Sequence, residues 1–274
     1  MRYVKLFENF EIVEPIKYGE PLNNREINIL KRCNVIYHGW ILKDDNYYYV
    51  FDHRCENIKD LPETYIHAVC KKANIKDYTI NDDHTVDVLG DVGFYHNLPR
   101  MSKIPLKFNN ISGNFTFINN DLTTLEGSPK SVGGYFLCYS NKLTTLEGSP
   151  KEVGGSFNCS GNNLTTLEGS PKSIPKDFSC ANNSLITLKG GPTFVGKDFY
   201  CYNNNLISLE GSPNNVGGEF NCYDNELTTL EGGPTYVGDD FFCHHNPLKS
   251  IEYKGVIKGN LVSRNSLREY PLQN

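Results

Sequence analysis

"LEGSPKSVGGYFLCYSNKLTTLEGSPKEVGGSFNCSGNN", residues 125 to 163, contains two nearly identical copies of one sequence. Phe136 and Cys138 in the first copy recur as Phe157 and Cys159 in the second, 21 residues later in each case. A fixed period of this length is typical of solenoid proteins, in which each unit buries its apolar edge against the next copy. The stretch therefore predicts a repeat fold.

The repeat extends well beyond these two copies. Six copies of L-x-x-L-x-G-x-P-x-x-V-G-G-x-F-x-C-x-x-N-x, with small departures, cover residues 122 to 247, and a worn seventh copy covers residues 101 to 121. The F-x-C core alternates with a period of two, which indicates a short strand. One strand in each unit predicts a parallel stack with about 4.8 Å between coils. Glycine and proline are too frequent for a helix in each repeat.

Two columns of side chains are expected to fill the inside of this stack. Six of the nine cysteines share one repeat position, and free cysteine behaves as a small buried hydrophobe. No CxxC pair supports a metal site. The phenylalanine column comprises Phe115, Phe136, Phe157, Phe178, Phe199, Phe220 and Phe241, and the cysteine column comprises Cys138, Cys159, Cys180, Cys201, Cys222 and Cys243.

An asparagine occurs between core positions in every copy. The row consists of Asn120, Asn141, Asn162, Asn183, Asn204, Asn225 and Asn246. Because a buried amide is tolerated only when it is hydrogen-bonded, this row predicts a structural ladder to the backbone rather than a catalytic group.

The pattern F-x-C-x-x-N-x-L-x-x-L, over residues 101 to 267, resembles the leucine-rich repeat signature L-x-L-x-x-N-x-L. Its proline and its 21-residue length are most similar to the short bacterial type found in pathogen effectors. "LTTLEGSPK" and the opening "MRYVKLFENF" also resemble small repeat proteins of large tailed bacteriophages. The resemblance implies a right-handed coil with a parallel concave sheet and an irregular, helix-poor return side. One departure is that Val132 stands four residues before Phe136, where the family usually leaves three.

The resemblance and the composition suggest three parts. We expect a small α+β capping domain over residues 1–90, the solenoid over 91–247, and a degenerate repeat and cap over 248–274. A unit as small as the first part is marginally stable alone, so its expected role is to cover the open apolar end of the solenoid.

Local patterns predict the elements of the amino-terminal third. A short helix is expected from Asn23 or Asn24 to about Cys33, and a hairpin follows over residues 34–53. A second helix is expected over residues 61–75, with a small hairpin from residue 78 to residue 90.

An enzymatic role for this third is an alternative with little support. The sequence contains no recognised nucleophile, zinc-protease or phosphate-binding motif, so we expect no catalysis and no cofactor. Ligase activity is not implied either, because the related effectors carry it in a further domain after the repeats. The candidate residues are His38, His53, Arg54, Cys55, Glu56 and Asp60.

Composition bears on partners and location. The net charge is −5, the pI is about 5.8, and no block of Lys or Arg stands out, which argues against nucleic acid or an anionic membrane as the partner. No apolar run approaches the length of a membrane span, and acids stand where a signal peptide needs its apolar core. We therefore expect a cytoplasmic protein, in the host cytoplasm if a phage encodes it.

The outward residues of the strands are free to bind a partner. Aromatic anchors with a charged border are typical of protein-binding surfaces, although exposed Tyr and Thr also suit strands simply as strand formers. The sequence favours a scaffold for a protein partner with a basic or neutral surface; a glycan-binding or adhesive surface is the alternative. The candidate residues are Tyr200, Tyr202, Tyr223, Phe242 and His244, bordered by Asp198, Glu219 and Asp240.

Overall fold

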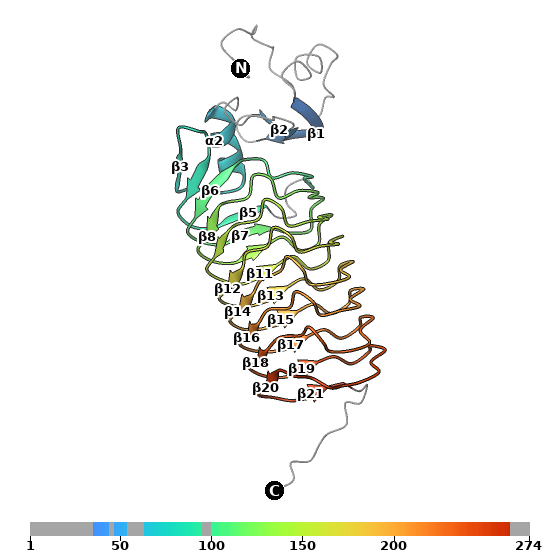
Figure 1. The fold of residues 1–274 in the computed structure, drawn as a ribbon. Helices are drawn as coiled ribbons and strands as arrows, with labels where there is room; N and C mark the ends of the chain where they lie inside the picture. Colours follow the sequence, from blue (N-terminus) through green and yellow to red (C-terminus); the bar gives the residue numbers. More distant parts are fainter. Residues whose placement is uncertain (1–34, 44–46, 54–62, 95–99, 264–274) are drawn as a thin grey trace.

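A computed structural model describes residues 35–43, 47–53, 63–94 and 100–263 of the chain. Residues 63–94 and 100–263 include a helix-poor stack of coils that contribute short parallel strands (Figure 1). The helix expected to end near Cys33 lies outside the described residues.

The phenylalanine strands form one continuous sheet, which we call the Phe-strand sheet. Its order is β21-β19-β17-β15-β13-β11-β9-β7-β5, and the pairings between neighbours are parallel. Phe157 is aligned with Phe136 on one side and with Phe178 on the other, so the 21-residue period sets the register. The strands are β5 (Val92–Phe94), β7 (Phe115–Phe117), β9 (Phe136–Leu137), β11 (Phe157–Asn158), β13 (Phe178–Ser179), β15 (Phe199–Tyr200), β17 (Phe220–Asn221), β19 (Phe241–Phe242) and β21 (Leu261–Val262).

A second column of short strands precedes the Phe-strand sheet in each coil, whereas the rest of the coil, for example residues 138–151, contains neither strand nor helix. The second column contains the valine or isoleucine that precedes the corner of each coil, and Val216 and Ile174 in it are fully buried. This column consists of two five-stranded sheets. The first has β3 (Tyr78–Ile80), β4 (Val86–Val88), β6 (Phe108–Ile111), β8 (Ser131–Val132) and β10 (Glu152–Val153); the second has β12 (Ser173–Ile174), β14 (Phe194–Val195), β16 (Asn215–Val216), β18 (Tyr236–Val237) and β20 (Val256–Ile257).

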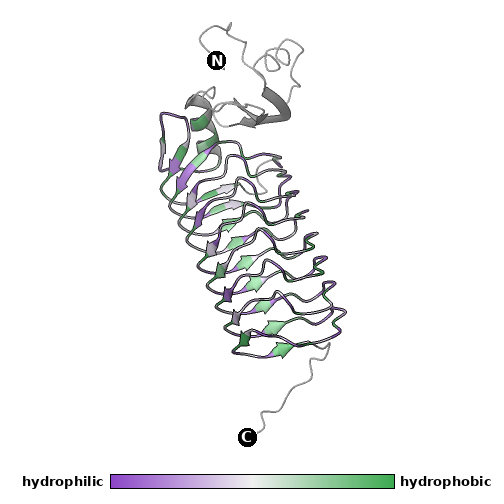
Figure 2. Cartoon of the chain, in the orientation of Figure 1, coloured by the Kyte–Doolittle hydropathy of each residue, from purple (hydrophilic) through white to green (hydrophobic). Residues whose placement is uncertain are grey.

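The phenylalanine and cysteine columns lie inside the stack, as predicted. All seven phenylalanine side chains are fully buried, and neighbouring rings from Phe115 to Phe220 stack with centroids 5.0–5.5 Å apart. The six cysteines of the column are buried and free. Figure 2 shows the hydrophobic colour of these strands recurring from coil to coil. Each buried Phe contributes about 1.5–3 kcal/mol through the hydrophobic effect.

The cysteine column makes stability depend on alkaline pH. Burial raises the pKa of the Cys180 thiol and raises that of Cys243 to about 11. These thiols stay neutral in the folded chain while their counterparts in the unfolded chain ionise above about pH 8.5. The raised pKa therefore favours unfolding as the pH rises past that value.

We expect the free energy of unfolding to fall between pH 8 and pH 10, measured by urea denaturation. Each thiol that ionises only on unfolding adds up to about 1.4 kcal/mol per pH unit to this slope. Cys180→Ala should reduce the slope by about that amount while lowering stability at pH 7. An unchanged slope in this variant would contradict the assignment of the column.

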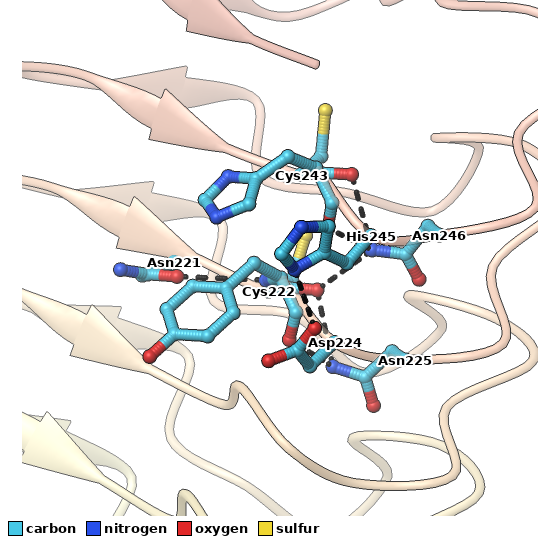
Figure 3. A network of polar contacts seen from close by, with 9 residues as sticks. Asn221, Cys222, Asp224, Asn225, Cys243, His245 and Asn246 are labelled. Atoms are coloured by element: carbon cyan, nitrogen blue, oxygen red, sulfur yellow. Dashed lines mark hydrogen bonds and ion pairs between the residues drawn. The ribbon is translucent and has the colours of Figure 1, made fainter. Parts of the chain in front are cut away.

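The asparagine row forms the expected ladder between coils. The Asn225 amide nitrogen donates to the carbonyl oxygens of Cys201 at 3.1 Å and Cys222 at 3.0 Å, and its side-chain oxygen accepts the Leu206 N–H at 3.0 Å. Figure 3 shows Asn225 and Asn246 in equivalent positions on successive coils. Each asparagine therefore joins its own coil to the one before it.

Five coils have glycine at the first position of the corner between the two strand columns, where a side chain would meet the preceding coil: Gly133, Gly154, Gly196, Gly217 and Gly238. A Cβ on Gly217 would lie 2.1 Å from the carbonyl oxygen of Gly196 in the preceding coil, and a Cβ on Gly154 would lie 2.2 Å from that of Gly133. These are contacts with backbone, which cannot rotate away. The Gly-Gly of the repeat is thus explained by the close approach of consecutive coils.

The described elements before the solenoid agree with two of the sequence predictions. Strands β1 (Val35–Lys43) and β2 (Tyr47–His53) form an antiparallel hairpin. Helix α2 (Glu63–Lys72) follows, and its Ile66 and Cys70 are fully buried in the same hydrophobic cluster as the coils.

The predicted hairpin from residue 78 to residue 90 is also present, and it joins the solenoid. Strands β3 and β4 pair antiparallel, and β4 then pairs parallel with β6 of the next coil. Strand β5 likewise pairs parallel with β7. The segment from Val86 to Phe94 therefore supplies one strand to each column, a coil that the sequence pattern did not show.

Candidate binding surface

The Phe-strand sheet has an outward side, which we call the Phe-strand face. Tyr200 and Phe242 are the second residues of β15 and β19, and they are partly exposed because the preceding phenylalanines point into the core. Tyr202 and Tyr223 follow two residues after consecutive strands and are also partly exposed. The strand periodicity thus places these aromatic residues on the side that the sequence predicts.

Three side chains on this face form a continuous aromatic ladder, defined as Tyr202, Tyr223 and His244. The rings of Tyr202 and Tyr223 stack with centroids 4.7 Å apart and planes 3° apart. Tyr223 and His244 stack at 4.8 Å and 11°. Because the repeat superimposes identical positions on successive coils, the rings are held in alignment. Such aromatic pairs contribute about 0.5–1.5 kcal/mol beyond their buried area.

Two further aromatic side chains contact the edges of the ladder. Tyr200 meets Tyr202 edge-on with centroids 6.3 Å apart, and Phe242 meets His244 edge-on at the same separation. The structure therefore brings all five predicted aromatic residues together in one cluster. Each ring of the cluster contacts at least one other ring of the cluster.

The acidic border has a structural role that sequence reasoning missed. One Asp198 carboxylate oxygen accepts the Glu219 N–H at 2.8 Å, and the corresponding oxygen of Asp240 accepts the Asn260 N–H at 2.7 Å. Asn114 makes the equivalent contact with the Tyr135 N–H at 2.8 Å. The recurrence of short Asp or Asn side chains directly after the glycine corner is the signal that could have predicted it.

The same acids affect one another electrostatically. Burial, together with the nearby Asp198, Asp239 and Asp240, raises the pKa of Glu219. Burial and a hydrogen bond from the Tyr200 hydroxyl to Asp198, at 3.0 Å, raise the pKa of Tyr200. Within the described ranges, no ion pair joins Asp198, Glu219 or Asp240 to a basic side chain. This part of the face therefore carries uncompensated negative charge.

A histidine pair closes the carboxy-terminal end of the cluster. Burial and the neighbouring His245 lower the pKa of His244, which keeps its ring neutral near pH 7. His245 lies 2.7 Å from an Asp224 carboxylate oxygen through its Nδ1, as Figure 3 shows. The two histidines thus differ in environment, and only His245 has a carboxylate partner at hydrogen-bond distance.

Most of the candidate catalytic cluster lies outside the described residues. His38 and His53 lie in β1 and β2, whereas residues 54–60 fall outside the described part of the chain. Among the residues that are described, no group of three or more His, Cys, Asp or Glu could hold a metal ion. A search of the same residues finds no helix with the length and apolar character needed to cross a membrane.

Comparisons with protein-family models, curated proteins and solved structures found no match to this chain. The structure itself shows a helix-poor parallel β-solenoid with repeats of about 21 residues.

Proposed function

We propose that this protein is a scaffold that binds a protein partner on its Phe-strand face and does not itself catalyse a reaction. The observation that carries the proposal is the cluster of five mutually supported aromatic side chains centred on the aromatic ladder. Pre-aligned rings lose little conformational entropy on binding, which is why rigid aromatic residues serve as interface anchors.

The acidic border favours a partner whose contacting surface is basic or neutral. Asp198, Glu219 and Asp240 carry negative charge that no described basic side chain neutralises by an ion pair. A partner with basic or neutral surface residues would complement this charge, and its association rate would fall as salt increases. The resemblance to phage repeat proteins suggests a host protein during infection as that partner, in the host cytoplasm.

The proposal also covers the handedness of the solenoid, its likeness to leucine-rich repeats and the division of the chain into parts. We propose a right-handed, leucine-rich-repeat-like solenoid over residues 91–247, with residues 1–90 as an α+β cap and residues 248–274 as a degenerate repeat and cap. Support for the cap comes from α2, whose Ile66 and Cys70 are buried in the hydrophobic cluster that includes the first coils.

The geometry favours a protein over a glycan as the ligand. Sugars bind aromatic side chains mainly through exposed ring faces, whereas Tyr223 is stacked between Tyr202 and His244. Its ring edge and hydroxyl remain for contact with a ligand. The glycan-binding alternative is therefore kept as an outcome of the test, and the proposal assigns no catalytic role to the cluster from His53 to Asp60.

Affinity capture from bacterial lysate tests the proposal with a matched pair of variants. The site variant carries Tyr200→Ala, Tyr202→Ala and Tyr223→Ala. The control carries Phe194→Ala and Tyr236→Ala, which remove aromatic side chains from β14 and β18 in the second strand column. We expect a protein that the intact chain and the control retain at equal levels and that the site variant loses at least tenfold.

Thermal unfolding of both variants establishes that they are folded before capture. If the folded site variant retains the same proteins as the intact chain, the Phe-strand face is not the binding surface. If neither chain captures protein while a glycan array gives a signal that the site variant loses, the glycan alternative replaces this proposal.

A further inference from the structure

One coil departs from the others at the corner between its two strands. Pro175 and Lys176 stand where the preceding coil has Gly154 and Gly155. Proline has no backbone N–H, so the substitution matters wherever that group is used between coils.

In the other coils this corner is linked to the preceding coil by two backbone hydrogen bonds. Gly196 N–H donates to the Ile174 carbonyl at 2.8 Å, and Thr193 N–H donates to the Lys172 carbonyl at 2.8 Å. Equivalent pairs of bonds are present at the corners that contain Gly133, Gly154, Gly217 and Gly238.

Both bonds are missing at the corner of Pro175. Between the described residues 151–153 and 172–175, Pro175 cannot donate to the Val153 carbonyl, and no bond joins Lys172 N–H to the Lys151 carbonyl. The strand column accordingly ends at β10 and begins again at β12, which gives two sheets instead of one. We call this boundary the seam.

The Phe-strand sheet is uninterrupted at the same level. Phe157 N–H donates to the Asp177 carbonyl at 2.9 Å, and Cys159 N–H donates to the Ser179 carbonyl at 2.8 Å. At the seam, backbone hydrogen bonds therefore join the two coils in the Phe-strand sheet, whereas the two bonds of the second strand column are absent. This asymmetry is the geometry of a hinge whose axis runs along the paired side.

Ser156 and Asp177 are hydrogen-bonded across this level beside the paired Phe strands. On the unpaired side, the Lys176 side chain reaches across the seam. The Lys176 ammonium lies 5.0 Å from the centroid of the Tyr135 ring, and 3.5 Å from its hydroxyl oxygen, two coils earlier in the stack. A cation over an aromatic ring at an exposed site contributes about 0.5–1 kcal/mol. This contact is strong enough to bias the closed form and weak enough to break readily.

We propose that the seam is a built-in hinge that opens on the side of the second strand column while the Phe-strand sheet stays paired. The contact between Lys176 and Tyr135 holds it closed. All the residues proposed for partner binding lie beyond the seam, so hinge motion changes their orientation relative to the amino-terminal coils. The inference rests on backbone hydrogen bonding and does not depend on the proposed function.

Amide hydrogen exchange of the full chain, resolved by residue, tests the open side of the hinge. The Lys172 amide should exchange at least tenfold faster than the amides of Thr193 and Asn214, which occupy the same position in later coils. Pro175→Gly restores the missing donor and should bring the rate at Lys172 to within threefold of theirs. Equal protection at the three positions in the unmodified chain would overturn the proposal.

Distance distributions from pairs of spin labels test the motion itself. Labels at Glu152 and Tyr236 span the seam, whereas labels at Ser173 and Val256 do not, and both pairs are four coils apart, or roughly 19 Å. The labels are attached to unnatural amino acids because the chain contains cysteines.

The pair that spans the seam should show the broader distribution, and Lys176→Gln should broaden it further without affecting the other pair. Equal widths for the two pairs would show that the stack is rigid at this level, and the hinge would have to be abandoned.

Discussion

Replacing Asn204 with alanine should lower the free energy of unfolding by about 3–5 kcal/mol. The Asn204 amide nitrogen donates to the carbonyl oxygens of Cys180 and Cys201, both at 3.1 Å. Its side-chain oxygen accepts the Leu185 N–H, also at 3.1 Å. Removing the amide leaves the buried Leu185 N–H without its acceptor, which costs about 1–3 kcal/mol. The Cys180 and Cys201 carbonyls keep the amides of Asn183 and Asn225 as donors, so each loses one of two side-chain hydrogen bonds, worth about 1 kcal/mol.

The adjacent Asn205 supplies the control for this prediction. Its side chain is exposed, and its backbone N–H bond to the Leu185 carbonyl does not involve the side chain. Asn205→Ala should therefore change stability by no more than about 0.5 kcal/mol. Urea denaturation of both variants measures the difference. Similar stabilities for the two would mean that the asparagine ladder does not hold the coils together.

Substitution at the glycine corner should be the second most damaging change. In Gly217→Ala the new methyl group would lie 2.1 Å from the Gly196 carbonyl oxygen, a backbone atom of the preceding coil. Neighbouring coils must separate to admit it, which breaks the Gly217 N–H bond to the Val195 carbonyl, 2.9 Å long. We expect a loss of about 3 kcal/mol.

Gly161→Asn is the matched control for the corner variant. Gly161 has a φ of 62°, and asparagine already occupies this backbone conformation at Asn182 and Asn203 in the next two coils. A Cβ at Gly161 would be no closer than 3.5 Å to its neighbours. The control should keep stability within about 0.5 kcal/mol, measured by the same denaturation. A Gly217→Ala protein as stable as this control would show that the coils are not in close contact at the corner.

The buried half of the fold could be predicted because each inward position is constrained in every coil. Phe199, Cys201 and Asn204 sit in environments that the 21-residue period reproduces, so their burial and bonding follow from the alignment of the copies. The second strand column could not be predicted in the same way. The strand Asn215–Val216 is followed directly by the glycine corner, so no alternating pattern like F-x-C continues through it.

The details of the candidate site depend on geometry that one sequence does not contain. The columns of Tyr202, Tyr223 and His244 were visible, but the coplanar stacking depends on side-chain rotamers. The hydrogen bond that Asp198 accepts from the next coil depends on how closely the coils approach. Pro175 likewise becomes informative only when the carbonyl that lacks a donor is identified.

The most direct test of the central claim is the affinity of the captured partner, once purified, for three forms of the protein. Isothermal titration should give a dissociation constant at least about 30-fold weaker for the variant lacking Tyr200, Tyr202 and Tyr223, because the loss of anchor side chains at an interface centre costs about 2–4 kcal/mol. The variant lacking Phe194 and Tyr236 should bind within about twofold of the intact chain. Equal affinities for all three folded forms would contradict the claim that the Phe-strand face binds the partner.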